Sequence, residues 1–239
     1  MENSCKENLK QSSKKWVIAS VYPKFRRNLC LRSTNADLYH YAGNNPVRYI
    51  DPDGKKIVVK GSVEQQNEIV RLINKYSYIQ YELSSNDELI LSGEINQKGS
   101  RKYSDDIQGL RNTGTETSIQ ISDIFVDPYT KKTSKIDGGE TFSNGKNDEI
   151  FIVITGRPTQ VSPSENGFLK ESSPERILLH EISGHALPRR FNIDENAVEI
   201  ENSIIRELNS KRLFFKLKFR MPDPEHHSLT PEERELLYK

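Results

Sequence analysis

The chain has 239 residues, of which 34% are hydrophobic and 29% are charged, so it can build only a modest core. Its 35 basic and 34 acidic residues leave a formal charge of +1, which excludes a general electrostatic attraction to nucleic acid or to an anionic membrane. No run of about 18 or more apolar residues predicts a membrane span, and we expect no cleavable signal peptide at the N-terminus.

Residues 1–35 are polar, locally basic and without clear periodicity. They predict a weakly ordered N-terminal segment with one short strand at residues 16–22. Both cysteines, Cys5 and Cys30, lie in this segment. The rest of the chain is therefore expected to fold without disulfides and without a cysteine-ligated metal.

Residues 37–54 read DLYHYAGNNPVRYIDPDG, with alternating aromatic positions and two turn sequences, which predict a β-hairpin. The stretch resembles the last segment of the Rhs/YD-repeat core domain. In that family the segment joins a large β-shell to a variable C-terminal toxin. The resemblance implies an Rhs-core-like tail at residues 36–54, a domain boundary near Gly54, and an activity that lies after it.

The chain from residue 55 onward has the patterns of a globular domain. Ser62 and Gln65 form a capping box that predicts the start of a helix. Residues 149–155 (EIFIVIT) are the most hydrophobic strand candidate, either buried in the core or an edge along which a peptide substrate lies. In chain order we expect a strand at 57–60, a helix at 62–76, a hairpin at 78–83 and 88–92, a short helix at 105–110, strand structure at 119–126, a turn-rich loop at 127–147 and the strand at 149–155.

Two longer helices and a terminal one are predicted after residue 170. Ser173 suits the N-cap of the first helix and Pro174 its first turn, and this helix is expected to end near Leu187 because Pro188 follows. Asp194 is expected to cap the second helix, which runs to about residue 209. Residues 221–239 then predict a linker, with His226 and His227 exposed, and a short helix that begins at residues 230–231.

The segment His180-Glu181-Ile182-Ser183-Gly184-His185 lies in the first of these helices. Two neutral imidazoles on one metal with a carboxylate beside them are typical of zinc hydrolases, and the usual spacing places the histidines four residues apart. Here the spacing is five, which on a regular helix leaves the rings roughly 140° apart. A shared metal therefore requires a helical bulge with i→i+5 hydrogen bonds, for which Gly184 is the best suited residue.

The motif resembles the His-Glu-x-x-Gly-His pattern of dipeptidyl peptidase III relatives, and its extension by Ala186 resembles metallopeptidase toxins of polymorphic toxin systems. The resemblance implies that His180 and His185 bind zinc. It also implies that Glu181 activates water and passes the proton to the leaving amine. The competing interpretation is that both histidines are ordinary core or surface residues.

A third ligand is expected on the following helix, as in the resembled families. Their pattern assigns Glu195 as the ligand and Glu199 as a residue that orients an imidazole. The helical wheel complicates this assignment, because Glu201 lies inside the apolar stripe, where a carboxylate needs a metal or a cation. We favour Glu195 as the third ligand, followed by Glu201 and then Glu199.

Together these features predict an α+β, zincin-like domain at about residues 55–220, with a small mixed or antiparallel sheet and an active-site helix followed by a ligand-bearing helix. The expected function is that of a zinc metallopeptidase, the toxic effector domain of an Rhs-type toxin. It would be made in the bacterial cytoplasm and delivered to a target cell by a specialised secretion system, to cleave a target protein or peptide. A cognate immunity protein is the expected partner. The alternatives are a zinc-dependent peptidoglycan-cleaving enzyme and an inactive binding module or remnant.

Overall fold

The computed structural model describes residues 56–143, 149–163 and 165–237, all of which belong to one compact unit. The expectations for residues 1–35 and 36–54, including the hairpin that resembles the Rhs core, lie outside the described residues. No helix among the described residues is long and apolar enough to cross a membrane.

The centre of the fold is a four-stranded sheet in the order β1 (Ile57–Val59), β4 (Thr117–Ile121), β8 (Ile150–Ile154) and β7 (Gly139–Ser143). The first three strands are parallel, and β7 runs antiparallel to β8 along the edge. The prediction of an α+β fold with a small mixed sheet is confirmed. The strand expected at 149–155 is a central strand, because it pairs with a neighbour on each side.

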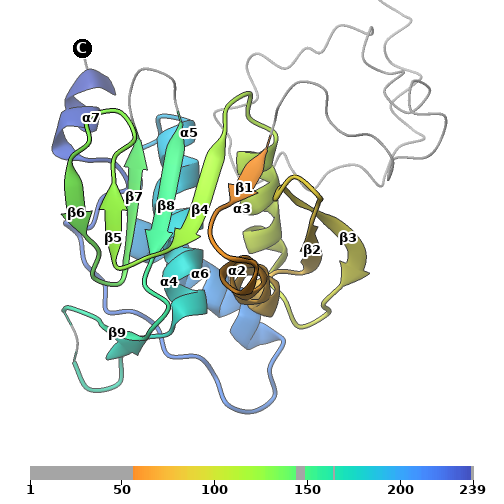
Figure 1. Cartoon of the computed structure of the whole chain (residues 1–239). Helices are drawn as coiled ribbons and strands as arrows, with labels where there is room; N and C mark the ends of the chain where they lie inside the picture. Colours follow the sequence, from red (N-terminus) through yellow and green to blue (C-terminus); the bar gives the residue numbers. More distant parts are fainter. Residues whose placement is uncertain (1–55, 144–148, 164, 238–239) are drawn as a thin grey trace, which may run out of the picture. The chain divides into compact units, whose positions relative to one another are not determined.

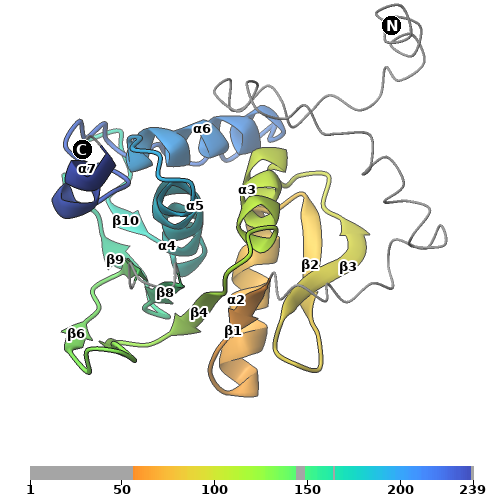
Figure 2. The same ribbon diagram turned by 90° about the horizontal axis from the view of Figure 1, so that it is seen from above.

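Helices cover one face of this sheet, and short two-stranded sheets flank it (Figures 1 and 2). The α-helices are α2 (Val63–Tyr76), α3 (Arg101–Arg111), α4 (Pro174–His180), α5 (Leu187–Arg190), α6 (Ala197–Ser210) and α7 (Pro231–Leu237), and η5 (Glu181–Ala186) is a π-helix between α4 and α5. The small sheets pair β2 (Ile79–Leu83) with β3 (Leu89–Ile95), β5 (Ile124–Val126) with β6 (Thr133–Lys135), and β9 (Thr159–Gln160) with β10 (Glu171–Ser172).

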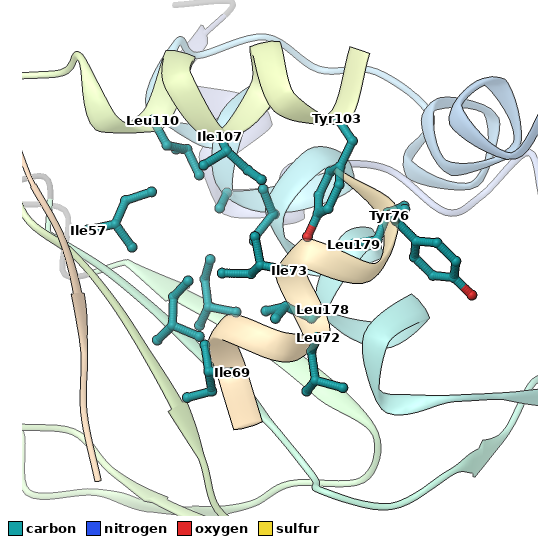
Figure 3. Packing of buried hydrophobic residues seen from close by; sticks show 14 of the residues in the cluster. Ile57, Ile69, Leu72, Ile73, Tyr76, Tyr103, Ile107, Leu110, Leu178 and Leu179 are labelled. Atoms are coloured by element: carbon teal, nitrogen blue, oxygen red, sulfur yellow. The ribbon is translucent and has the colours of Figure 1, made fainter. Parts of the chain in front are cut away.

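Strand β8 divides its side chains between two apolar clusters because successive residues of a strand point to opposite faces. Ile150, Ile152 and Ile154 face the helices and join the main core. Val153 and Phe151 face the other side, where they pack with residues of the β5–β6 region and β7. The main core continues between α2, α3 and α4, as Figure 3 shows for the labelled residues, and it fixes α4 against the sheet.

Local signals placed α2 correctly. The Ser62 hydroxyl accepts from the Gln65 N–H, and the Gln65 side chain accepts from the Ser62 N–H, so the predicted capping box is present. The hairpin of β2 and β3, the strand β1 and the terminal helix α7 are also confirmed. Helix α3 is longer than the predicted 105–110.

Three expectations were wrong. The loop predicted at 127–147 contains β6 and β7, because short polar strands such as GETFS acquire strand geometry from pairing rather than from their own apolar pattern. The helix predicted to end near Leu187 continues into α5, since Pro188 lies in the first turn after the π-helix. The N-cap of α6 is Asn196 instead of Asp194, and its side chain accepts from the Glu199 N–H.

Candidate metal centre

The helix that carries His180 and His185 contains the bulge that the five-residue spacing requires. The π-helix η5 starts directly after His180 and includes His185. Hydrogen bonds from i to i+5 add one residue to the turn, which returns two residues five apart to the same side of the helix. The ring centroids of His180 and His185 lie 5.0 Å apart.

Gly184 is needed here because another helix passes very close to it. A β-carbon on Gly184 would lie 3.0 Å from the β-carbon of Ala197, at the start of α6. Its backbone φ is not in the left-handed region, so the glycine provides space rather than an unusual conformation. The π-turn and the first turn of α6 can therefore touch, which brings α6 against the histidine-bearing helix.

The third member of the cluster is His226. Its Nε2 atom lies 3.1 Å from Nε2 of His180 and 3.3 Å from Nε2 of His185. Among the described residues, these three histidines form the group whose arrangement could hold a metal ion. The segment that carries His226 is fixed by a hydrogen bond from the Ala197 N–H to the His226 carbonyl, 3.0 Å long.

The second nitrogen of each ring faces an oxygen atom. His180 Nδ1 lies 2.9 Å from Glu201 Oε2, and His185 Nδ1 lies 3.2 Å from the Ser228 carbonyl. His226 Nδ1 faces Asp223 at the longer distance of 3.8 Å. Because an acceptor beside Nδ1 favours the tautomer with hydrogen on that atom, the contacts of His180 and His185 direct their Nε2 lone pairs toward the common centre. Lone pairs that converge on one point repel one another, and a metal ion held there would remove that repulsion.

Two of the rings, those of His185 and His226, are also held in the state that binds metal. Burial lowers the pKa of His185 to about 3, with smaller contributions from the positive charges of His180 and the nearby arginines. Burial and the neighbouring histidines lower the pKa of His226 to about 3 as well. Both imidazoles are therefore neutral near pH 7, as a ligand must be.

The predicted third ligand is corrected by this geometry. Glu195 is exposed and contributes only its backbone carbonyl, which accepts from Ser228. Glu199 is exposed on α6 and does not orient an imidazole. The physical reason is the start of α6 at Ala197, which leaves Glu195 before the helix and turns Glu201, instead of Glu199, toward His180.

Glu201 forms the buried polar support of the site. Its side chain is 1% exposed and pairs with Arg176, itself 3% exposed, at 2.5 Å. Arg220 lies 3.6 Å from the same carboxylate. Burial by itself would raise the pKa of Glu201, but His180 and the two arginines lower it to about 2. The carboxylate is thus ionised and fixed beside the ring that it orients, which agrees with the expectation that it needs a cation.

Glu181 lies beside the cluster with its carboxylate held by the edge strand. The Thr141 hydroxyl donates to Glu181 Oε2 at 2.8 Å. Burial raises the pKa of Glu181, although His180, Thr141 and the arginines oppose the shift. A β-carbon on Gly139 would lie 2.8 Å from the Glu181 side chain and 2.6 Å from Ile177, so β7 can approach the helix only with a glycine at this position.

These groups open onto a cleft of about 300 Å³ between the sheet edge and the C-terminal segment. The three histidines, Glu181, Arg189 and Arg220 line it together with residues 137–141. Arg220 Nη1 lies 3.3 Å from His180 Nε2, and the Arg189 guanidinium donates to the Thr141 carbonyl. The cleft thus combines possible metal ligands, a carboxylate with a raised pKa and two cations.

The sequence predicted His180, His185 and Glu181 to lie together, and the structure brings them together. The sequence did not indicate His226 as a member of the cluster, because His226 was expected to be exposed. It also did not indicate that strand β7 holds the Glu181 carboxylate through Thr141. One feature of the sequence could have indicated His226. The chain has only five histidines, and two of them are adjacent at positions 226 and 227. His227 does lie outside the cluster, where it pairs with Asp194 at 3.2 Å.

Neither family models nor curated proteins nor solved structures gave a match to this chain. The functional interpretation therefore depends on the residues and their geometry.

Proposed function

We propose that the chain is a zinc-dependent peptidase with His180, His185 and His226 as ligands and Glu181 as the acid–base residue. The observation that carries the proposal is the convergence of three imidazole Nε2 atoms beside a buried carboxylate. Two nitrogens at about 2.05 Å from one tetrahedral zinc ion are roughly 3.3 Å apart. The Nε2 separations of 3.1 and 3.3 Å agree with that value.

The donor set favours zinc as a catalytic rather than a structural ion. Three imidazoles leave one position of a tetrahedral site open, whereas structural zinc sites usually use four protein ligands. The three histidines line the cleft, so an ion held by them would be accessible from it. Zinc in such a site supplies Lewis acidity and lowers the pKa of water.

Glu181 is suited to proton transfer because its pKa is raised while its position is fixed. A carboxylate with a pKa closer to neutral can accept a proton from water and return it to a leaving amine within one cycle. Thr141 holds one oxygen, Oε2, by a hydrogen bond. The other oxygen can then face the reacting groups.

The edge strand β7 favours a peptide as the substrate. The Thr155 N–H donates to the Gly138 carbonyl at 2.7 Å, so the alternation of an antiparallel pair directs the backbone groups of Gly139 and Thr141 away from β8. The Thr141 carbonyl already accepts from Arg189, so a peptide would pair with the backbone groups of Gly139 and with the Thr141 N–H. An extended peptide can form main-chain hydrogen bonds with such an edge. At Gly139 this edge lies directly against Glu181, so a bound peptide bond would lie near the acid–base residue.

The broader context of the proposal comes from the sequence. The zincin-like architecture, the role as an Rhs-type toxic effector, delivery to a target cell and neutralisation by an immunity protein all derive from the resemblances at residues 37–54 and 180–186. We retain them as parts of the proposal, and they would be tested separately by toxicity after expression in the cytosol and in the periplasm.

The central test compares Glu181→Gln with Glu199→Gln, the same change at an exposed position of α6. Both variants and the wild type are purified, their zinc content is measured, and hydrolysis of a peptide library and of peptidoglycan is assayed. We expect one zinc per chain in all three, with peptide hydrolysis reduced by a factor of about 100 or more only in Glu181→Gln. Wild type without bound zinc contradicts the metal site, and hydrolysis of peptidoglycan alone contradicts the substrate class.

A further inference from the structure

The loop at residues 211–220, which follows α6, presents three consecutive apolar side chains to solvent. Leu213, Phe214 and Phe215 are 89%, 76% and 92% exposed, and we refer to them as the apolar tip. The segment leaves the end of α6 and runs outside the packed helices (Figure 1). Isolated exposed apolar residues are common, but three adjacent residues of this size at nearly full exposure are a feature that needs an explanation.

Hydrogen bonds to two asparagines of α6 fix the part of the loop that follows the apolar tip. The Asn209 side chain accepts from the Leu217 N–H and donates to the Leu217 carbonyl. Asn202 makes the same pair of bonds to the backbone of Arg220. Both asparagines belong to α6, so the helix fixes the base of the loop, and the exposure of the tip does not arise from a free tail.

The backbone at the tip supports the same conclusion. Phe215 has a φ of 53°, in the left-handed region that aromatic residues rarely adopt. Such a conformation persists only where the surrounding structure determines it. Phe215 adopts this conformation while its side chain is almost fully exposed.

The loop is also strongly basic. Residues 211–220 read KRLFFKLKFR, with five basic and no acidic residues, in a chain whose total charge is only +1. Lys211 pairs with Glu207, and Arg220 faces Glu201. In the described part of the chain the other three, Arg212, Lys216 and Lys218, form no salt bridge. The Lys216 ammonium donates to the backbone carbonyls of Asn209 and Arg212, so Arg212 and Lys218 are the charges that a partner can reach most readily.

We propose that this loop docks the protein on the surface of an anionic membrane. Leucine and phenylalanine can enter the boundary between headgroups and acyl chains, while flanking lysines and arginines meet anionic headgroups. A narrow tip of three residues fits insertion into lipid better than it fits a protein interface, which needs a broad complementary area of roughly 800 Å² per partner. The proposal does not depend on the metal site.

Docking is tested by flotation of the full chain with vesicles of phosphatidylcholine alone and of phosphatidylcholine with about 30% phosphatidylglycerol. We expect binding to the anionic vesicles that falls steeply with salt. Changing the apolar tip to Ser-Ser-Asn should reduce the partition coefficient at least tenfold, and Arg212→Gln with Lys218→Gln should reduce it about fivefold per charge removed. Matched controls change exposed residues elsewhere, which are Val63, Ile95 and Val126 to Ser in one variant and Lys98 and Lys132 to Gln in another.

The controls should bind as the wild type does, and all variants should unfold at nearly the same urea concentration because the changed side chains are exposed or, for Arg212, only half-buried. Equal binding by the tip variant and the wild type overturns the proposal, as does the absence of binding to both kinds of vesicle. Concentration-dependent self-association that the tip variant abolishes, without vesicle binding, would show that the surface contacts a second copy of the chain and would also overturn it.

Discussion

The buried pair of Arg176 and Glu201 should link the stability of the fold to the metal site, and the two roles can be separated by mutation. Arg176 Nε lies 2.5 Å from Glu201 Oε1, with both side chains almost fully buried. The other oxygen of Glu201 lies 2.9 Å from His180 Nδ1. One carboxylate therefore compensates a buried cation and also orients a candidate ligand.

Glu201→Gln should destabilise the protein by about 3–5 kcal/mol, because it leaves the Arg176 guanidinium buried without its counterion. The double variant Arg176→Met with Glu201→Leu removes both charges and should recover most of this loss. In neither variant can the side chain hold His180 as the carboxylate does, so zinc affinity should fall by a factor of about 10–100 in both.

Urea unfolding in the presence of EDTA measures the change in stability, and zinc competition titration of the folded proteins measures the change in zinc affinity. Glu199→Gln, on the exposed face of the same helix, provides the control and should change neither. A double variant that binds zinc as tightly as the wild type would refute the orienting role of Glu201. A loss below about 1 kcal/mol in Glu201→Gln would refute the claim that the pair is a buried charge interaction.

The remaining predictions concern other parts of the site and the core behind it. His226→Ala should abolish stoichiometric zinc binding while His227→Ala retains it, as measured by metal analysis after dialysis, because only His226 belongs to the cluster. Gly184→Ala should destabilise the fold by about 1–3 kcal/mol in urea unfolding, despite the higher helix propensity of alanine, because the new β-carbon would lie 3.0 Å from that of Ala197; equal stability would show that the two helices can separate without cost. Burial raises the pKa of Asp106 to about 7, so its neutral form stabilises the fold at low pH and this contribution is lost as the pH rises through 7. Asp106→Asn should therefore become progressively more stable than the wild type between about pH 4 and pH 7, by up to about 1.4 kcal/mol per pH unit, and a difference independent of pH would contradict the assignment.

Local signals in the sequence determined much of the helical framework. The capping box at Ser62 fixes where α2 begins, because all of its partners lie within one turn. The spacing of His180 and His185 by itself requires a bulge if the two rings share a metal, since a regular helix cannot bring residues five apart to one ion. The π-helix between α4 and α5 fulfils that requirement.

Tertiary structure decided the rest of the site. His226 lies 46 residues after His180, and its position depends on a backbone bond to the start of α6 and on the course of the C-terminal segment. The choice between Glu195, Glu199 and Glu201 depended on the residue at which α6 begins and on the rotation of that helix against Arg176. The spacing of residues in the sequence determines neither the residue at which α6 begins nor the rotation of that helix.

The edge strand β7 is a second element that its own sequence did not predict. Its sequence, GETFS, has little intrinsic strand character, and it becomes a strand because β8 offers an unpaired edge. Glycine at 139 then allows the strand to pass Glu181 at contact distance. The sequence by itself determined which residues of the helix lie together at the candidate site, because those relations span a few residues. Only the folded chain decided which distant groups complete the site, because packing between elements sets those distances.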